Sequence, residues 1–111
     1  MNQVTLLGRI GTEPELIQTE NNLHILKFSL ATNDKRGDAL ETTWHRVVVF
    51  GKTAEINAKN LHRGCEALVL GKISNKSYTN KEGVKVYTSE VVGFVVRPTS
   101  IVGGNEETLD F

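Results

Sequence analysis

Hydrophobic and polar residues alternate over much of this chain, and alternation with a period of two is typical of strands that are buried on one face. These stretches are rich in β-branched and aromatic residues and are separated by glycine, proline and asparagine turns. They cover Gln3–Ile10, Leu23–Thr32, Thr42–Gly51, Cys65–Ile73 and Val84–Val96. The sequence therefore predicts five strands, with a polar loop over Asn33–Leu40 and a turn over Asn80–Gly83.

One segment, Thr53–His62, has helical periodicity instead. Thr53 can serve as its N-cap, and Ala54, Ala58 and Leu61 recur at helical spacing. Three strands, a short helix and two more strands, in this order, predict an all-β OB-fold. The expected architecture is a five-stranded, partly closed barrel with one short helix between strands 3 and 4. A β-sandwich would need more strands in this length.

The 111 residues are enough for one small domain. We expect an OB-fold domain over residues 1–102 and a short flexible acidic tail over residues 103–111. The sequence contains no run of 18 apolar residues and no secretory signal pattern, so we expect no membrane partner and a cytoplasmic location. Cys65 is the only cysteine, which excludes an internal disulfide and predicts a small buried side chain.

The charge is balanced but unevenly distributed. There are 13 basic and 13 acidic residues, and Glu106, Glu107 and Asp110 all lie near the end of the chain. Residues 1–102 therefore hold 13 basic against 10 acidic residues, a net charge of +3. Such a mild excess is weak support for a polyanionic partner, and the position of each charge matters more than the total.

The stretch Thr42–Gly51 contains the only tryptophan. In a strand, Trp44, Arg46 and Phe50 share one face with Val48, whereas His45 shares the other face with the aliphatic Val47 and Val49. One face therefore presents two aromatic rings and a cation. We interpret it as a surface for single-stranded nucleic acid, in which aromatic rings stack on bases and basic side chains contact phosphates.

A second segment repeats the pattern, because Lys72, Lys76 and Tyr78 share parity. Lys81 and Lys85 lie near the tip of the following hairpin, and Arg9 is on the outward face of the first strand. The alternative interpretation is that Trp44 and Phe50 belong to the core and that Arg46 is an incidental surface charge. We favour nucleic-acid binding because an exposed stripe of large aromatics has no structural need.

Catalysis has little support in the sequence. His24, His45 and His62 fall in different predicted elements, and none of the short metal-binding, phosphate-binding or nucleophile motifs occurs. We therefore expect no enzyme activity, no metal site and no cofactor.

The chain resembles the bacterial single-stranded DNA-binding protein family along nearly its whole length. The matching stretches are Met1–Glu15, Phe28–Thr32, Thr43–Glu55, Leu61–Gly64, Gly71–Ile73, Tyr78–Gly83 and Tyr87–Val92, in the order of the family. The resemblance implies an OB-fold subunit of a homotetramer, with a dimer as the alternative. It also implies a nucleoid-associated protein that binds single-stranded DNA without sequence specificity during replication, recombination and repair.

The resemblance also assigns roles to individual residues. Trp44, Phe50 and Tyr78 fall on base-stacking positions of the family, and His45 falls on a subunit interface. The first strand takes part in subunit pairing, which would explain the apolar Leu7 on its outward face. The tip formed by Glu106, Glu107, Thr108, Leu109, Asp110 and Phe111 matches the segment that docks replication and repair proteins.

The chain departs from the family in three places. The segment Asn33–Leu40 is short and lacks an aromatic residue, few residues separate Val102 from Glu106, and no proline precedes Phe111. These features indicate a short member, such as one encoded by a phage or mobile element. Two other functions remain open: an OB-fold subunit for primosome assembly or replication restart that acts through protein contacts, and an RNA-binding OB module.

Overall fold

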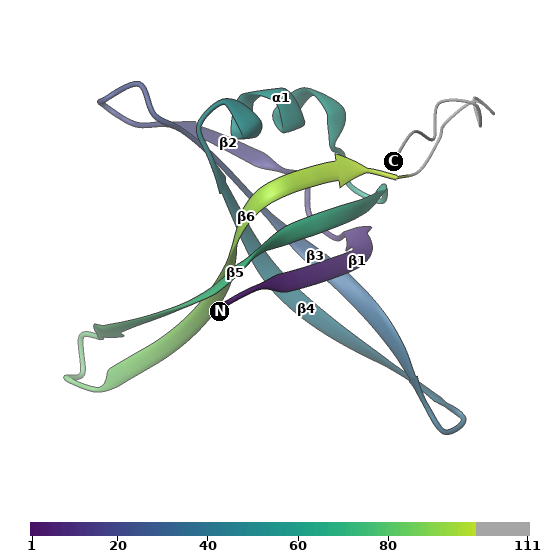
Figure 1. Cartoon of the computed structure of the whole chain (residues 1–111). Helices are drawn as coiled ribbons and strands as arrows, with labels where there is room; N and C mark the ends of the chain where they lie inside the picture. The colour runs from purple at the N-terminus through teal and green to yellow at the C-terminus, as the bar shows by residue number, and fades with distance from the viewer. Residues whose placement is uncertain (100–111) are drawn as a thin grey trace.

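The structure is a computed structural model, and it describes residues 1–99. Six strands and one helix follow one another along the chain, as Figure 1 shows. They are β1 (Val4–Ile10), β2 (Glu15–Gln18), β3 (His24–Arg36), β4 (Ala39–Phe50), α1 (Lys52–Asn60), β5 (Glu66–Thr79) and β6 (Lys85–Pro98).

The strands form one sheet in the order β1-β5-β6-β4-β3-β2. A further antiparallel pairing, of Arg9 with Ala31 and Ile10 with Leu30, joins β1 to β3 and closes five of the strands into a barrel. The pairing of β4 with β6 is parallel, and every other pairing is antiparallel. The predicted all-β OB-fold, with its short helix after the third barrel strand, is confirmed.

Close backbone packing at two points of the barrel wall leaves no room for a side chain. A Cβ atom built on Gly8 of β1 would collide with the carbonyl oxygen of Ala31 on β3. A Cβ on Gly71 of β5 would likewise collide with the carbonyl oxygen of Val92 on β6. Glycine at these two positions therefore lets neighbouring strands approach and bend where the sheet curls into a barrel.

The core consists of the inward side chains of the strands and of the helix that covers one end of the barrel. Leu26 and Leu30 of β3, Val49 of β4 and Val69 of β5 are fully buried. Cys65 is also buried, as predicted. Burial of such aliphatic side chains stabilises a fold by roughly 1.5–3 kcal/mol each relative to exposure.

The helix differs in detail from the prediction. It begins at Lys52, with Gly51 as N-cap and no side-chain capping bond, so Thr53 lies inside the first turn and the predicted Thr53 cap is wrong. It ends at Asn60, which leaves His62 outside the helix. Gly51 adopts a φ of 76°, a conformation that glycine reaches without strain.

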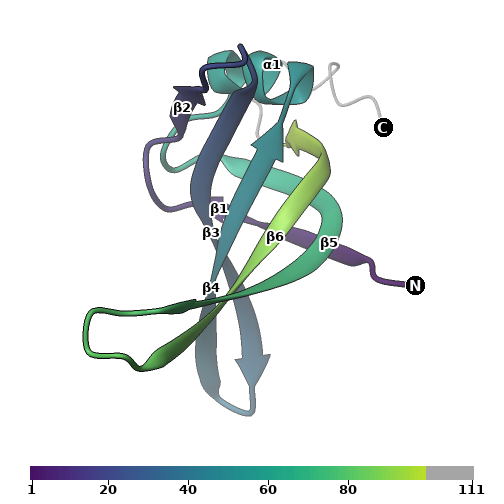
Figure 2. The same ribbon diagram turned by 90° about the vertical axis from the view of Figure 1, so that its left-hand side faces the viewer.

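Two hairpins extend beyond the barrel at the end opposite α1, and they diverge in Figures 1 and 2. The predicted polar loop Asn33–Leu40 is wrong, because β3 and β4 stay paired out to Arg36 and Ala39. The β5–β6 hairpin is paired out to Thr79 and Lys85. On the β5 arm residues 75–79 are exposed on both faces, so no hydrophobic pattern marks this part as a strand, whereas the β6 arm lies within the predicted strand Val84–Val96.

The sequence also failed to predict β2. This edge strand has only four residues and pairs with β3 from Glu15–Lys27 to Gln18–His24. Only Ile17 in β2 is partly buried, so no alternation of buried and exposed residues marks this strand.

Within residues 1–99 no helix is long and apolar enough to cross a membrane. The predicted acidic tip, Glu106–Phe111, lies outside the described residues.

Candidate nucleic-acid interface

Strand β4 presents two different faces, as its sequence predicts. Trp44 is 62% exposed and Phe50 41% exposed, and the exposed Arg46 lies between them. On the other face Val47 and Val49 are almost fully buried. One face of β4 therefore packs in the barrel, while the other offers two aromatic rings and a guanidinium group to the solvent.

Val48 is the one buried member of the Trp44 face. Its neighbours are Lys27 on β3 and Val92 on β6, and Val92 is paired in turn with Lys72 on β5. These four residues form a row across the outer surface of four strands, which we call the lysine row. Val48 and Val92 form the apolar middle of this row. Each end is an exposed lysine ammonium group with no ion-pair partner within residues 1–99.

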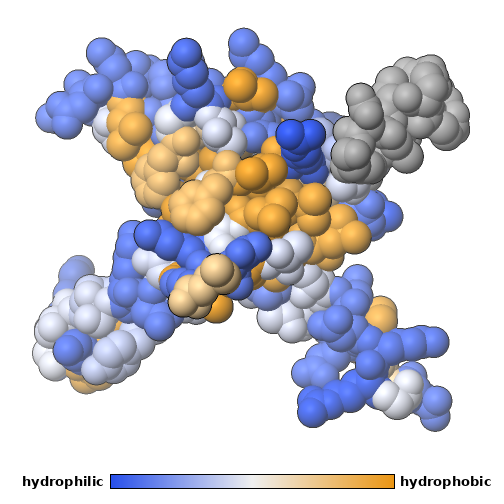
Figure 3. Space-filling view, viewed as in Figure 1, coloured by the Kyte–Doolittle hydropathy of each residue, from blue (hydrophilic) through white to orange (hydrophobic). Residues whose placement is uncertain are grey.

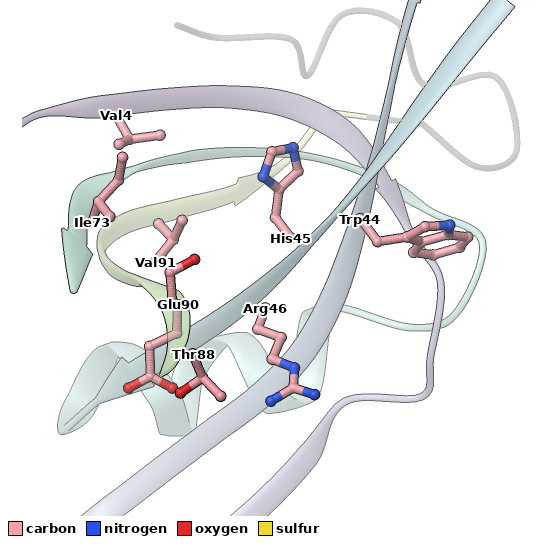
Figure 4. A pocket seen from close by; sticks show the side chains of 9 residues that line it. Val4, Trp44, His45, Arg46, Ile73, Thr88, Glu90 and Val91 are labelled. Atoms are coloured by element: carbon pink, nitrogen blue, oxygen red, sulfur yellow. The ribbon is translucent and has the colours of Figure 1, made fainter. Parts of the chain in front are cut away.

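A second row contains the charges around Arg46. The parallel register of Val47 with Val91 and Val48 with Val92 places Glu90 beside Arg46 one step earlier. Both line an open pocket of about 360 Å³, and Figure 4 shows them on the same side of it. Glu90 forms an ion pair of 2.7 Å with Lys76, so the Lys76 charge is partly balanced within this face.

The Trp44 ring is held at the barrel wall by a glycine. A Cβ atom on Gly11 would collide with the ring, so the ring packs directly on the backbone there. In Figure 4 the ring is directed away from the other residues of the pocket.

Arg9 lies on the same outer face as Trp44, because Ala31 is paired with both of them. Arg9 donates a hydrogen bond of 3.1 Å to the Gly64 carbonyl.

The β5–β6 hairpin separates the predicted binding residues between its two faces. Tyr78 is exposed and shares a face with Lys72 and Lys76, as its parity predicts. Lys85 is paired with Thr79 and therefore lies on the opposite face, with its Nζ 5.5 Å from the centre of the Tyr87 ring. Lys81 is in the turn at the tip of this hairpin.

Leu7 and His45, the two predicted interface residues, line one open pocket of about 330 Å³ between β1, β3 and β4. Leu7 is exposed, and one ring nitrogen of His45 is 2.9 Å from the hydroxyl oxygen of Thr32. The sequence assigns these two residues to different strands and does not show whether they lie close together. The structure brings them to the same end of the barrel.

Two exposed aromatic residues were not among the predicted site residues. Tyr87 is 73% exposed on β6, and Phe94 is 58% exposed further along the same strand. Both are aromatic residues within a predicted strand, which was the only indication in the sequence that they could belong to the site. Only the register between strands shows which face each ring occupies.

Comparison with known proteins identifies the family of this chain. Residues 1–98 match the single-strand binding protein family. A single-stranded DNA-binding protein of Xanthomonas campestris pv. campestris is 35% identical, in an alignment that covers 96% of this chain and 63% of the relative. One of Xanthomonas axonopodis pv. citri is 34% identical, with 96% and 61% covered. The chain thus spans about six tenths of the length of these relatives, and it belongs to the single-strand binding protein family.

Proposed function

We propose that this chain binds single-stranded DNA with little sequence preference. The observation that carries the proposal is the exposed stripe of Trp44, Arg46 and Phe50 on one face of β4. Tyr78 extends the same face onto the β5–β6 hairpin. Bases stack on the three rings, while Arg46 and the lysine row contact the phosphates.

Physical chemistry supports this assignment. Leaving a large aromatic side chain in water gives up roughly 1.5–3 kcal/mol that burial would provide. Stacking of one base on an aromatic ring is worth roughly 1–3 kcal/mol, a general value for proteins of this class. Every base has a stacking face, so such contacts carry little sequence information. A protein of this kind serves wherever duplex DNA is opened, in replication, recombination and repair.

The proposal extends to self-association, with a homotetramer as the expected assembly. Within the described residues, Val4–Gly8 of β1 is paired on one side only, with β5. Beside this open edge, the outer face has Leu7 opposite Leu68, and Leu70 opposite Val95. An unpaired strand edge beside apolar side chains is a surface that a second copy can cover.

Partner docking through the acidic tip, Glu106–Phe111, is the last part of the proposal. Acidic residues next to the apolar Leu109 and Phe111 fit an apolar groove with a basic rim.

Titration of the protein with poly(dT) tests the binding proposal. We expect quenching of the Trp44 fluorescence and an affinity that falls steeply as salt rises. Arg46→Gln should weaken binding and reduce the slope of log K against log salt by about 0.7, because one phosphate contact is lost. Lys59→Gln makes the same charge change on α1, away from this face, and should leave the slope unchanged. Absence of quenching at low salt, or equal slopes for the two variants, would contradict the proposal.

RNA is the main alternative ligand, and the same titration separates it. Poly(U) and duplex DNA are run in parallel under identical salt. Stronger binding to poly(U) than to poly(dT) would assign the stripe to RNA instead.

Light scattering tests the assembly. We expect a mass near four times the 12.3 kDa of one chain. Leu7→Glu should lower the mass, because it places a charge beside the open edge of β1. Ile56→Glu makes a similar change at an exposed position of α1 and should leave the mass unchanged. A single-chain mass at micromolar concentration would refute self-association.

Deletion of Glu106–Phe111 tests the role of the tip. The truncated chain should bind poly(dT) as well as the full chain or better, because an anionic competitor is removed. A large loss of affinity would mean that the tip contributes to the DNA site itself.

A further inference from the structure

A β-bulge in β6 places two consecutive side chains on the outside of the barrel. Gly93 is paired with Gly71, and Val95 is paired with Leu70, so Phe94 has no partner across β5. Gly93 and Val96 are buried, whereas Phe94 is 58% exposed and Val95 is also exposed. A bulge inserts one extra residue and re-aims the side chains beside it. It accounts for the exposure of Val95 directly after the exposed Phe94.

The ring of Phe94 lies on the same face as the ring of Phe50. Val48 and Val92 are paired in parallel, and each phenylalanine follows its valine by two residues in the same direction. Residues two apart on a strand share a face, and neighbouring strands are about 4.8 Å apart. The pairing of Val49 with Gly93 is the last one between β4 and β6, and Phe50 and Phe94 are the next residues on the outer face of each strand. Figure 3 shows hydrophobic side chains gathered across the middle of the face that carries β5 and β6.

The charges beside this pair favour a polyanion over a second copy of the chain. The lysine row is the adjacent row of the sheet, and it ends in Lys27 on one side and Lys72 on the other. A second copy that covered both rings would approach these two ammonium groups and remove water from them at a cost. Phosphates of a bound strand would instead replace their counterions. The proposed self-association surface begins around Leu7 at the open edge of β1 and reaches Val95, the residue after Phe94.

We propose that Phe94 and Phe50 form a two-ring platform that stacks successive bases of single-stranded DNA, with Lys27 and Lys72 contacting the phosphates on either side. This inference rests on the proposed function and adds a base-stacking residue to it. The platform continues the path of the bases from Trp44 through Phe50 and across the barrel onto β6.

The test compares ring removal at two exposed aromatic positions of the same strand. Phe94→Leu keeps apolar volume but removes the ring, and should weaken binding of poly(dT) about five-fold or more. Its salt slope should match that of the unmodified chain, because no charge is lost. Phe94→Tyr keeps the ring and should bind as the unmodified chain does. Tyr87→Leu removes a ring from the opposite face of the hairpin and should change the affinity less than two-fold.

The possible failures are distinguishable. If the unmodified chain does not bind poly(dT), the proposed function fails, and this inference fails with it. If the unmodified chain binds and Phe94→Leu is within two-fold of it, only the platform is refuted. If Phe94→Leu lowers the mass in light scattering, Phe94 is a contact between copies of the chain, and the assignment to DNA is overturned.

Discussion

The two-residue periodicity of β4 is the constraint on which the rest of the structure depends. This strand is paired with β3 along its whole length and with β6 around Val48, so it cannot rotate without breaking both pairings. The same register that buries Val47 and Val49 leaves Trp44 and Phe50 in the solvent. Stability and the candidate binding surface are therefore coupled, because a shift by one residue would exchange the two faces.

Barrel closure extends this surface to residues that are distant in sequence. Ala31 is paired with both Arg9 and Trp44, which brings β1 and β4 onto one outer wall. Pairing across β4, β6 and β5 aligns the lysine row on the same wall. Gly8 lets β1 approach β3 at the closure and Gly71 lets β5 approach β6, since a Cβ at either position would collide with a backbone carbonyl. The two rows that contain Arg46 and the lysines lie between the rings of Trp44 and Phe50, which suits a chain of bases joined by phosphates.

The parts of the fold that face water on one side only could be predicted from the sequence. Leu26 and Leu30 alternate with more polar residues because their strand is half buried. The outer ends of β3, β4 and β5 and the whole of β2 were missed because both of their faces are largely exposed, so burial imposes no pattern on them. The sequence also could not place Lys85 relative to Tyr78, because the register across the turn decides which face each occupies. Phe94 was missed for a related reason, since the register between β4 and β6 decides that it shares a face with Phe50.

The central claim is that bases of single-stranded DNA lie on the outer face of β4. Photocrosslinking with an oligo(dT) that contains 5-iodouracil tests it most directly, because the reaction requires close contact between the base and an aromatic side chain. We expect crosslinks at Trp44 and Phe50, with Tyr78 next. Crosslinks confined to Tyr87, or to residues of α1, with none on β4, would contradict it.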